Sequence, residues 1–429
     1  MKFYNTNGKS IKNYLNFAPA KVNDKLTSMD LSNYELPLFT NLLILLVAAR
    51  LLGEVFERLK QPSMIGEILA GIILGPSIFN VIHRTESISI ISDLGVFLLV
   101  IIAGLEIKIE GIIKSLQGKN IMVSLLAFIL PIFSGFAIGY LFDMSAMTTL
   151  FIGLCIAITA LPVSARILMD LGKLNTPIGQ KIISTAVVND VLALTILGII
   201  LNVRTTDMEL NSIAEVASIS ILKLFVFILI LLAAFYIIRR ISKSAKYIES
   251  YLNKLLSYLK GKESLFAVFF VFVLIFATIT ESLGFHFVVG AFFASILIGD
   301  NIIGKKHLRT IHDTTNGLAM GLLAPVFFAG IGLEFNFIAI QNYWLLIVVL
   351  AVSYLSKILG GYLGGKFIGL NNRTSLGLGF GLNARGIMEL IIANIAYKSG
   401  LIDLEIFSIL IIMGILTTVV TPFALKKYL

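Results

Sequence analysis

The sequence predicts an all-α polytopic membrane protein with about thirteen transmembrane helices. Of its 429 residues, 57% are hydrophobic and only 14% are charged, whereas a soluble domain carries about a quarter charged residues. The mean hydropathy is +0.94. The apolar residues form long runs separated by short charged loops, which is typical of membrane-spanning helices. These runs are far longer than the roughly ten alternating residues of a β-barrel strand, so the spans are expected to be helical.

Each predicted span is an apolar run, and a polar tail precedes the first one. Residues 1–36 contain lysines and no apolar signal-peptide core, so the first span is expected to target the chain to the membrane. The single cysteine, Cys155, excludes an intramolecular disulfide. The spans are expected at about 37–59, 64–80, 88–107, 119–142, 146–171, 176–203, 212–240, 262–283, 285–300, 313–335, 343–368, 374–399 and 405–426.

The basic residues predict the orientation of the chain. Loops after odd-numbered spans hold most of the Lys and Arg residues, as Lys305, Lys306 and Arg309 illustrate. By the positive-inside rule these loops are cytoplasmic, although the five lysines of the tail oppose this assignment. The N-terminus is therefore expected outside a plasma membrane and the C-terminus in the cytoplasm. The net charge of +9 then reflects membrane topology, and no nucleic-acid partner is expected.

An internal repeat is visible in two motifs. "GEILAGIILG" at 66–75 aligns with "GAFFASILIG" at 290–299, and "GLE" at 104–106 recurs at 332–334. Matching motifs lie an odd number of spans apart, so the two copies cross the membrane in opposite directions. Patterns of small residues recur in any helical bundle, but two matches in the same order favour a repeat. We expect two inverted six-helix repeats, at about 37–203 and 262–426, with a linker helix at about 212–240.

Inverted repeats are typical of secondary transporters, which place interrupted helices around a site at the membrane midplane. Two corresponding spans carry helix-breaking residues. The fifth span contains "ITALPVSAR", in which Pro162 removes a backbone donor. The twelfth contains "GFGLNARGIME", whose glycines and Asn383 can break that helix. A simple proline kink and a glycine packing face are the structural alternative.

Two charges are predicted near the middle of the membrane. Asp190, beside Asn189 in "STAVVNDVLALTIL", has no opposite charge within seven residues and follows Lys181 by nine, or roughly 14 Å of helix. Lys357 precedes Lys366 by nine residues and is expected at a similar depth. An intramembrane charge costs roughly 2.5–3.5 kcal/mol, so such residues usually serve function. An inert buried ion pair is the other interpretation.

The aspartate indicates a transport chemistry. A single carboxylate can hold a monovalent metal cation (Na⁺ or K⁺) or a proton, and alternating access converts that competition at Asp190 into cation/proton antiport. A cation channel and an organic-anion symporter stay open as alternatives; the first needs a continuous pore and the second a larger polar cavity. An enzyme is not expected, because no catalytic triad or nucleotide fingerprint is present. No cofactor is expected either.

A second charged pair lies in the twelfth span. Arg385 and Glu389 are four residues apart, so they can pair on one face of a helix. This spacing favours a structural role, and bracing of the core acids by Arg385 is the alternative. Together with Pro162 and Asn383, the two residues are expected to support the core of the site.

Four stretches resemble the cation/proton antiporter superfamily, which has the sodium/proton exchanger fold. The resemblance covers most of residues 37–429 and is nearest to the branch with plant cation/proton exchangers and bacterial sodium/proton and potassium-efflux antiporters. The Asn–Asp pair with a distant lysine is its most specific feature. The matching stretches are "IGEILAGIILGPSIF", "ITALPVSARILMDLG", "STAVVNDVLA" and "NARGIMELIIANIA" followed by "TTVVTP".

The resemblance implies a homodimer of thirteen-helix protomers, each with a dimerisation domain and a moving core domain. The broken fifth and twelfth spans would cross beside Asp190, which would carry the cation and the proton. Thr159, before the break, would offer a nearby oxygen ligand, Asn189 would be part of the cation- and proton-binding site, and Lys357 matches the core lysine of the family. Electrogenic members have an aspartate where this chain has Asn189. Some relatives continue into a large cytosolic domain, whereas no cytosolic regulatory domain is expected before the end of this chain at Leu429.

Overall fold

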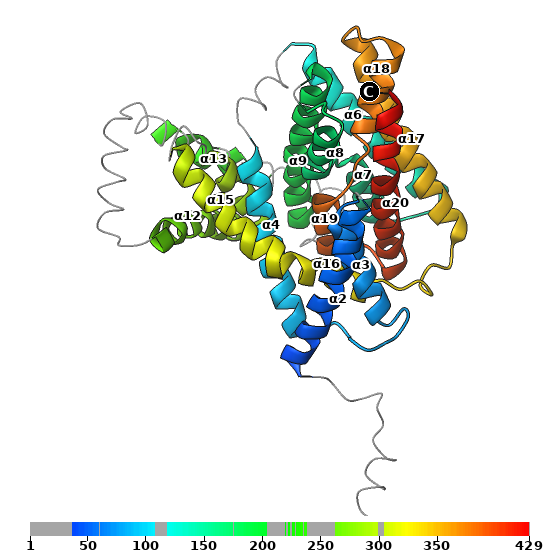
Figure 1. The fold of residues 1–429 in the computed structure, drawn as a ribbon. Coiled ribbons are helices and arrows are strands. Elements are labelled where there is room, and N and C mark those ends of the chain that lie inside the picture. Colours follow the sequence, from blue (N-terminus) through cyan, green and yellow to red (C-terminus); the bar gives the residue numbers. More distant parts are fainter. Residues whose placement is uncertain are drawn as a thin grey trace, which may run out of the picture. The chain divides into compact units, whose positions relative to one another are not determined.

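A computed structural model describes residues 37–59, 61–107, 118–174, 176–203, 262–298 and 304–428, with parts of 219–237. Residues 42–429 form one compact unit. Within the described ranges the regular structure is helical, without strands. The helices are α2 (Leu38–Arg58), α3 (Ser63–Leu74), α4 (Glu86–Glu106), α6 (Asn120–Leu141), α7 (Ala146–Ala157), α8 (Leu161–Asp170), α9 (Pro177–Val203), α12 (Lys262–Ser282), α13 (Phe287–Leu297), α15 (Lys305–Leu318), the π-helix η3 (Ala319–Leu323), α16 (Ala324–Glu334), α17 (Tyr343–Phe367), α18 (Asn372–Gly381), α19 (Ile387–Lys398) and α20 (Leu404–Tyr428) (Figure 1).

The protein is an integral, multi-pass membrane protein. Among the described residues, eight helices or continuous helical runs are long and apolar enough to cross a bilayer. They are α2, α4, α6, α9, α12, the run from α15 to α16, α17 and α20. The helices α3, α7 and α13 are apolar but shorter. The predicted linker helix at 212–240 lies mostly outside the described residues, so the total of about thirteen spans stays a prediction.

Two predicted boundaries were wrong by more than a few residues. The second span was expected to continue to residue 80, but α3 ends at Leu74, where Gly75 and then Pro76 interrupt the helix. The tenth span was expected to begin at residue 313, but α15 begins at Lys305. The first turns of α15 are polar, and hydropathy alone does not detect them.

The helices of residues 42–429 pack into two groups. In the first, called the α4 group, α3 packs on α16, α4 packs on α13 and α16, and α12 packs on α13. In the second, called the α17 group, α17 packs on α6 and α18, α6 also packs on α7, α20 packs on α18 and α19, and α8 packs on α9. The groups meet where α19 contacts α4 and where α9 contacts α13.

Glycines bring two helices of the α17 group close to their neighbours. A Cβ atom on Gly135 of α6 would lie 2.3 Å from the Cα atom of Gly153 in α7. A Cβ atom on Gly361 of α17 would lie 2.5 Å from the Cα atom of Gly379 in α18. Because only glycine allows such an approach, these contacts hold α7 and α18 tightly against α6 and α17. Both α7 and α18 end at the site described below.

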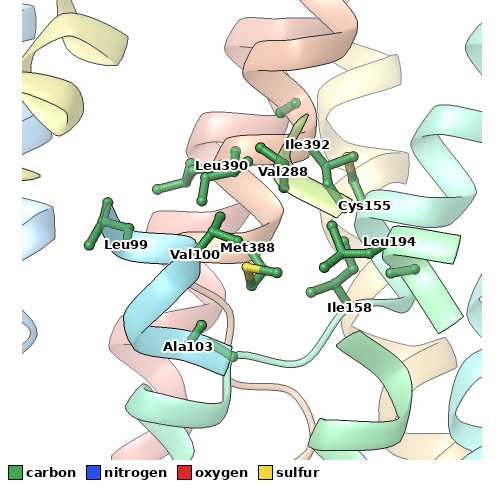
Figure 2. Packing of buried hydrophobic residues seen from close by; sticks show 14 of the residues in the cluster. Leu99, Val100, Ala103, Cys155, Ile158, Leu194, Val288, Met388, Leu390 and Ile392 are labelled. Atoms are coloured by element: carbon green, nitrogen blue, oxygen red, sulfur yellow. The ribbon is translucent and has the colours of Figure 1, made fainter. Parts of the chain in front are cut away.

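A packed apolar layer lies between α4 and α19 (Figure 2). It contains Val100 of α4 together with Leu390 and Ile392 of α19, all of which are buried. Cys155 of α7 and Leu194 of α9 belong to the same cluster. The start of α19 is therefore fixed by apolar contacts with both helix groups.

Candidate functional site

Two helices are interrupted at the centre of the α17 group. The chain leaves helical conformation between Ala157, the end of α7, and Leu161, the start of α8. It leaves helical conformation again between Gly381, the end of α18, and Ile387, the start of α19. The interruptions lie in the two stretches for which the sequence predicted broken helices. Pro162 lies in the first turn of α8, where its missing N–H group leaves no helical bond unmade.

The two interruptions are bonded to each other. The amide of Ala160 donates a hydrogen bond to the carbonyl of Ala384 at 2.8 Å. The hydroxyl of Thr159 donates to the carbonyl of Leu382 at 2.9 Å, and both residues are buried. Irregular backbone at membrane depth is tolerated only where protein or a lined cavity satisfies its polar groups. Each interruption supplies partners that the other needs.

Asp190 and Asn189 lie in α9 beside the first interruption. The Asn189 side-chain amide donates to the Thr159 hydroxyl at 3.4 Å, and the Asp190 side chain is 1% exposed. The Oδ1 atoms of Asp190 and Asn189 are buried without a hydrogen-bond partner among the described residues. The structure therefore brings together the predicted residues Thr159 and Asn189, with Asp190 next in sequence to Asn189.

Lys357 is fully buried in α17 and reaches the end of the broken helix α7. Its ammonium group donates to the carbonyl of Ala127 in α6 at 3.1 Å and to the carbonyl of Ala157. Ala157 is the last residue of α7, where the helix dipole and the free carbonyl groups favour a cation. Lys357 also interacts electrostatically with Asp190. The predicted core lysine thus balances the partial negative charge at the end of α7 and part of the negative charge of Asp190.

Arg385 lies in the second interruption and is fully buried. Its guanidinium donates to the carbonyl of Cys155 in α7 at 2.7 Å and to that of Ser353 in α17 at 3.4 Å. Its Nη1 atom lies 3.8 Å from a carboxylate oxygen of the fully buried Glu389. The predicted Arg385–Glu389 pair is present, and Arg385 also covers the end of α7 alongside Lys357.

Asn383 also lies in the second interruption, and its side chain is fully buried. Neither its Oδ1 atom nor its Nδ2 atom has a hydrogen-bond partner among the described residues. The sequence predicted Asn383 only as a residue that breaks a helix and supports the core. Its unsatisfied amide is a feature that no sequence pattern indicated.

A cavity of about 30 Å³ adjoins the first interruption, and a water molecule fits such a volume. Ala160 of the interruption and Met388 of α19 line it, together with Met320 of the π-helix and Glu106 at the end of α4. Sequence reasoning gave Glu106 no part in the site. Its repeated "GLE" motif was the available signal, but it was interpreted only as a mark of the repeat.

The chain is similar to a family of transporters along most of its length. The family model described as sodium/hydrogen exchanger, transmembrane, matches residues 42–429. The chain is 29% identical over 391 residues to the probable Na(+)/H(+) antiporter GerT of Bacillus cereus, covering 91% of this chain and 99% of that protein. It is 30% identical over 393 residues to the Na(+)/H(+)-K(+) antiporter GerN of Bacillus cereus, covering 91% and 96%.

The fold is similar to that of a solved transporter structure. The sodium proton antiporter MjNhaP1 from Methanocaldococcus jannaschii, solved at pH 8, superposes with a TM-score of 0.66. The similarity covers 90% of this chain and 95% of that protein, at 16% sequence identity. At this identity the similarity concerns the fold alone.

Proposed function

The chain belongs to the sodium/hydrogen exchanger family, and from that premise we propose that it exchanges Na⁺ or K⁺ for a proton by alternating access. Relatives at 29–30% identity are named as antiporters, so the chain is a transporter and not an enzyme. The observation that carries the proposal is Asp190: a buried carboxylate with an unpartnered oxygen, beside the point at which two interrupted helices are bonded to each other. Intramembrane acids of this kind mark ion pathways and proton relays.

In the proposed mechanism, Asp190 holds the cation and the proton in turn. Either ligand neutralises the carboxylate, and a buried charge without compensation is costly. Asn189 and Thr159 supply further oxygen atoms next to the carboxylate. Lys357 and Arg385 donate to carbonyl groups at the end of α7. They thereby fix the interrupted helix and supply the positive field in which Asp190 exchanges its ligands.

Contacts in the α4 group support the proposed inverted repeats. A Cβ atom on Gly332 of α16 would lie 2.1 Å from the carbonyl oxygen of Ile68 in α3. A Cβ atom on Gly104 of α4 would lie 2.7 Å from the carbonyl oxygen of Phe292 in α13. In the repeat alignment Gly104 corresponds to Gly332 and Ile68 to Phe292. In both contacts, the glycine of the "GLE" motif in one repeat packs against the helix that carries the first motif of the other repeat.

The α17 group supports the same repeats. Gly135 contacts Gly153, and Gly361 contacts Gly379. In sequence, Gly361 follows Gly135 by the same distance as Gly379 follows Gly153. We therefore propose repeats at about 37–203 and 262–426, a linker helix at about 212–240 and a polar tail at 1–36, giving about thirteen spans. The α17 group would be the moving core domain and the α4 group the dimerisation domain of a homodimer.

The charge distribution supports a proposed orientation in a plasma membrane. Loops rich in lysine and arginine are cytoplasmic by the positive-inside rule. In this orientation the loop that precedes α15 is cytoplasmic, and so is Glu106 at the end of α4. The cavity that Glu106 and Ala160 line would then connect the site to the cytoplasmic side.

Cation-dependent proton movement in vesicles tests the proposal. Proteoliposomes with an imposed pH gradient receive Na⁺, K⁺ or choline in turn. We expect Na⁺ or K⁺ to dissipate the gradient and choline to have no effect. The rates of dissipation with Na⁺ and with K⁺, compared with each other, give the selectivity. Cation flux without coupled proton movement would instead indicate a channel. Proton movement only with an added organic anion would indicate a symporter, and either result contradicts antiport.

A further inference from the structure

Asn383 carries an unsatisfied polar side chain at the second interruption. The amide is fully buried, yet its oxygen and its nitrogen both lack a hydrogen-bond partner among the described residues. Buried polar side chains are nearly always hydrogen-bonded, because leaving one unpaired is unfavourable. An amide without partners among the described residues at this position calls for a ligand of another kind.

The neighbours of Asn383 place it at the junction of the two interruptions. The carbonyl of Leu382, just before it, accepts from the Thr159 hydroxyl at 2.9 Å. The carbonyl of Ala384, just after it, accepts from the Ala160 amide at 2.8 Å. Thr159 in turn accepts from the Asn189 side chain at 3.4 Å. Asn383 is thus one short chain of hydrogen bonds from the residue that precedes Asp190.

Among the described residues, the Oδ1 atoms of Asn189, Asp190 and Asn383 are buried without a donor, as are both carboxylate oxygens of Glu389 further along, in α19. Hard cations without strong geometric demands are bound by carboxylate and amide oxygens of this kind. We propose that Asn383 is a ligand of the transported cation and sets the selectivity between Na⁺ and K⁺. This inference rests on the proposed function, and it adds a ligand from the second interruption to those from the first and from α9.

A neutral ligand from the second interruption has a mechanistic consequence. Asp190 and Asn189 belong to α9, whereas Asn383 belongs to the segment between α18 and α19. Cation binding would therefore add a direct link between the second interruption and α9, and a proton on Asp190 alone would not. The size of the oxygen cage depends on the side chain at position 383, which is why selectivity is assigned to this residue.

The test uses the purified full-length protein and two readouts. The first is the rise in melting temperature as NaCl, KCl or choline chloride is titrated, which measures cation binding without transport. The second is the apparent KM for each cation in proteoliposomes. We expect Asn383→Ala to weaken Na⁺ and K⁺ binding about ten- to hundredfold, the effect of losing one bond to a charged group. We expect Asn383→Ser, with a shorter oxygen ligand, to raise the Na⁺ KM more than the K⁺ KM, because the cage becomes wider.

A matched control separates ligation from packing. Asn394 of α19 is also buried and also has an unpartnered Oδ1 atom, but it lies within a regular helix. We expect Asn394→Ala to keep wild-type cation affinity. If Asn383→Ala does not fold, Asn383→Ser carries the test alone through the ratio of the two KM values.

The possible outcomes distinguish this inference from the function on which it rests. Asn383 is not a ligand if its variants keep wild-type affinity and an unchanged Na⁺/K⁺ ratio while Asp190→Asn loses cation-dependent stabilisation. In that case the antiport mechanism still stands. If Asp190→Asn itself binds and exchanges cations like the wild type, the proposed function is wrong, whatever Asn383 does.

Discussion

At the scale of single residues, the site is defined by polar atoms that the protein leaves unsatisfied. Asp190 is buried with an unpartnered Oδ1 atom, whereas the buried cations have carbonyl partners. Lys357 donates to two backbone carbonyl groups and Arg385 to two others. Because the cations are held by backbone atoms, we expect the carboxylate to stay available for a ligand from solution.

Competition at one carboxylate predicts a pH-dependent cation affinity. A proton bound to Asp190 excludes the cation, so the apparent KM for Na⁺ or K⁺ should rise as pH falls, by up to ~tenfold per pH unit when the site is mostly protonated. Initial rates of exchange across two pH units measure this KM. A KM that stays constant while the maximal rate changes would mean that cation and proton occupy separate sites.

The sequence indicated the residues of the site better than their partners. Asp190 and Lys357 were detectable because a charge inside a long apolar run is unfavourable unless it has a function. The carbonyl groups of Ala127, Cys155 and Ala157 were not, since every residue carries the same backbone and only the fold selects which atoms face a cation. The unsatisfied amide of Asn383 was hidden for the same reason.

At the scale of the element, the broken helices are held by charges at their ends. Arg385 precedes α19, covers carbonyl groups of α7 and α17, and lies 3.8 Å from Glu389 in the first turn of α19. All of these groups are fully buried. The carboxylate of Glu389 therefore balances the charge of Arg385, whose guanidinium bonds a carbonyl group at the end of α7.

Removing Glu389 should destabilise the protein more than removing a similar exposed acid. We expect Glu389→Gln to lower the free energy of unfolding by about 3–5 kcal/mol, because Arg385 is left buried without its counter-charge. The exposed pair of Glu54 and Arg58 has the same spacing, so Glu54→Gln serves as the matched control with an effect below about 1 kcal/mol. Unfolding of the purified variants in detergent measures both.

A double variant checks the cause of that effect. If the loss arises from an uncompensated charge, Arg385→Gln combined with Glu389→Gln should be less destabilised than the sum of the single variants. Equal melting of Glu389→Gln and wild type would show that the pair contributes nothing, and strict additivity would show that the two residues act independently.

Element boundaries were predictable where apolar runs met helix-breaking residues. The interruptions at 158–160 and 382–386 coincide with "ITALP" and "GLNARG", because proline and glycine carry local signals. The polar start of α15 and the π-helix at Ala319–Leu323 were not predicted. The start of α15 is too polar to be detected by hydropathy. The π-helix depends on tertiary contacts that no local pattern specifies.

At the scale of the whole molecule, an ion pair between described residues connects the two helix groups. Lys398 at the end of α19 lies 2.6 Å from Asp93 of α4. Among the other ion pairs of the described residues, some join residues of one helix, as in α15, and others join segments within one group, as Arg84 before α4 and Glu334 of α16 do. Alternating access requires the α17 group to move against the α4 group. If the protein works by the proposed alternating access, we expect the Lys398–Asp93 pair to break in each cycle.

A covalent link at this position should stop transport. We expect Asp93→Cys with Lys398→Cys, treated with a short bifunctional thiol reagent, to lose exchange and to regain it when the link is cleaved. Each single cysteine variant with the same reagent is the control, and the native Cys155 is buried. Full exchange by the cross-linked protein would contradict relative motion of the two groups.

Charge balance is also a property of the whole cycle. Lys357 donates to carbonyl groups that hold an ammonium whether or not Asp190 carries a cation, so we expect it to keep its proton throughout. One cation then exchanges for one proton, and membrane voltage contributes nothing, whereas an electrogenic cycle would gain about 2.3 kcal/mol per charge per 100 mV. Recording on a solid-supported membrane tests this. A transient current that reverses with the cation gradient would show that Lys357 also releases a proton.

The role of Asp190 is the central claim, and exchange by Asp190→Asn in proteoliposomes tests it most directly. The control is Asp403→Asn, at an exposed position where the side chain bonds the amide of Ile406 and asparagine can replace it. Both variants are expected to purify folded, with wild-type behaviour on size-exclusion chromatography. On addition of Na⁺ or K⁺ to vesicles with an imposed pH gradient, we expect Asp403→Asn to dissipate the gradient like the wild type and Asp190→Asn to leave it intact. Cation-dependent dissipation by Asp190→Asn at a wild-type rate would contradict the account.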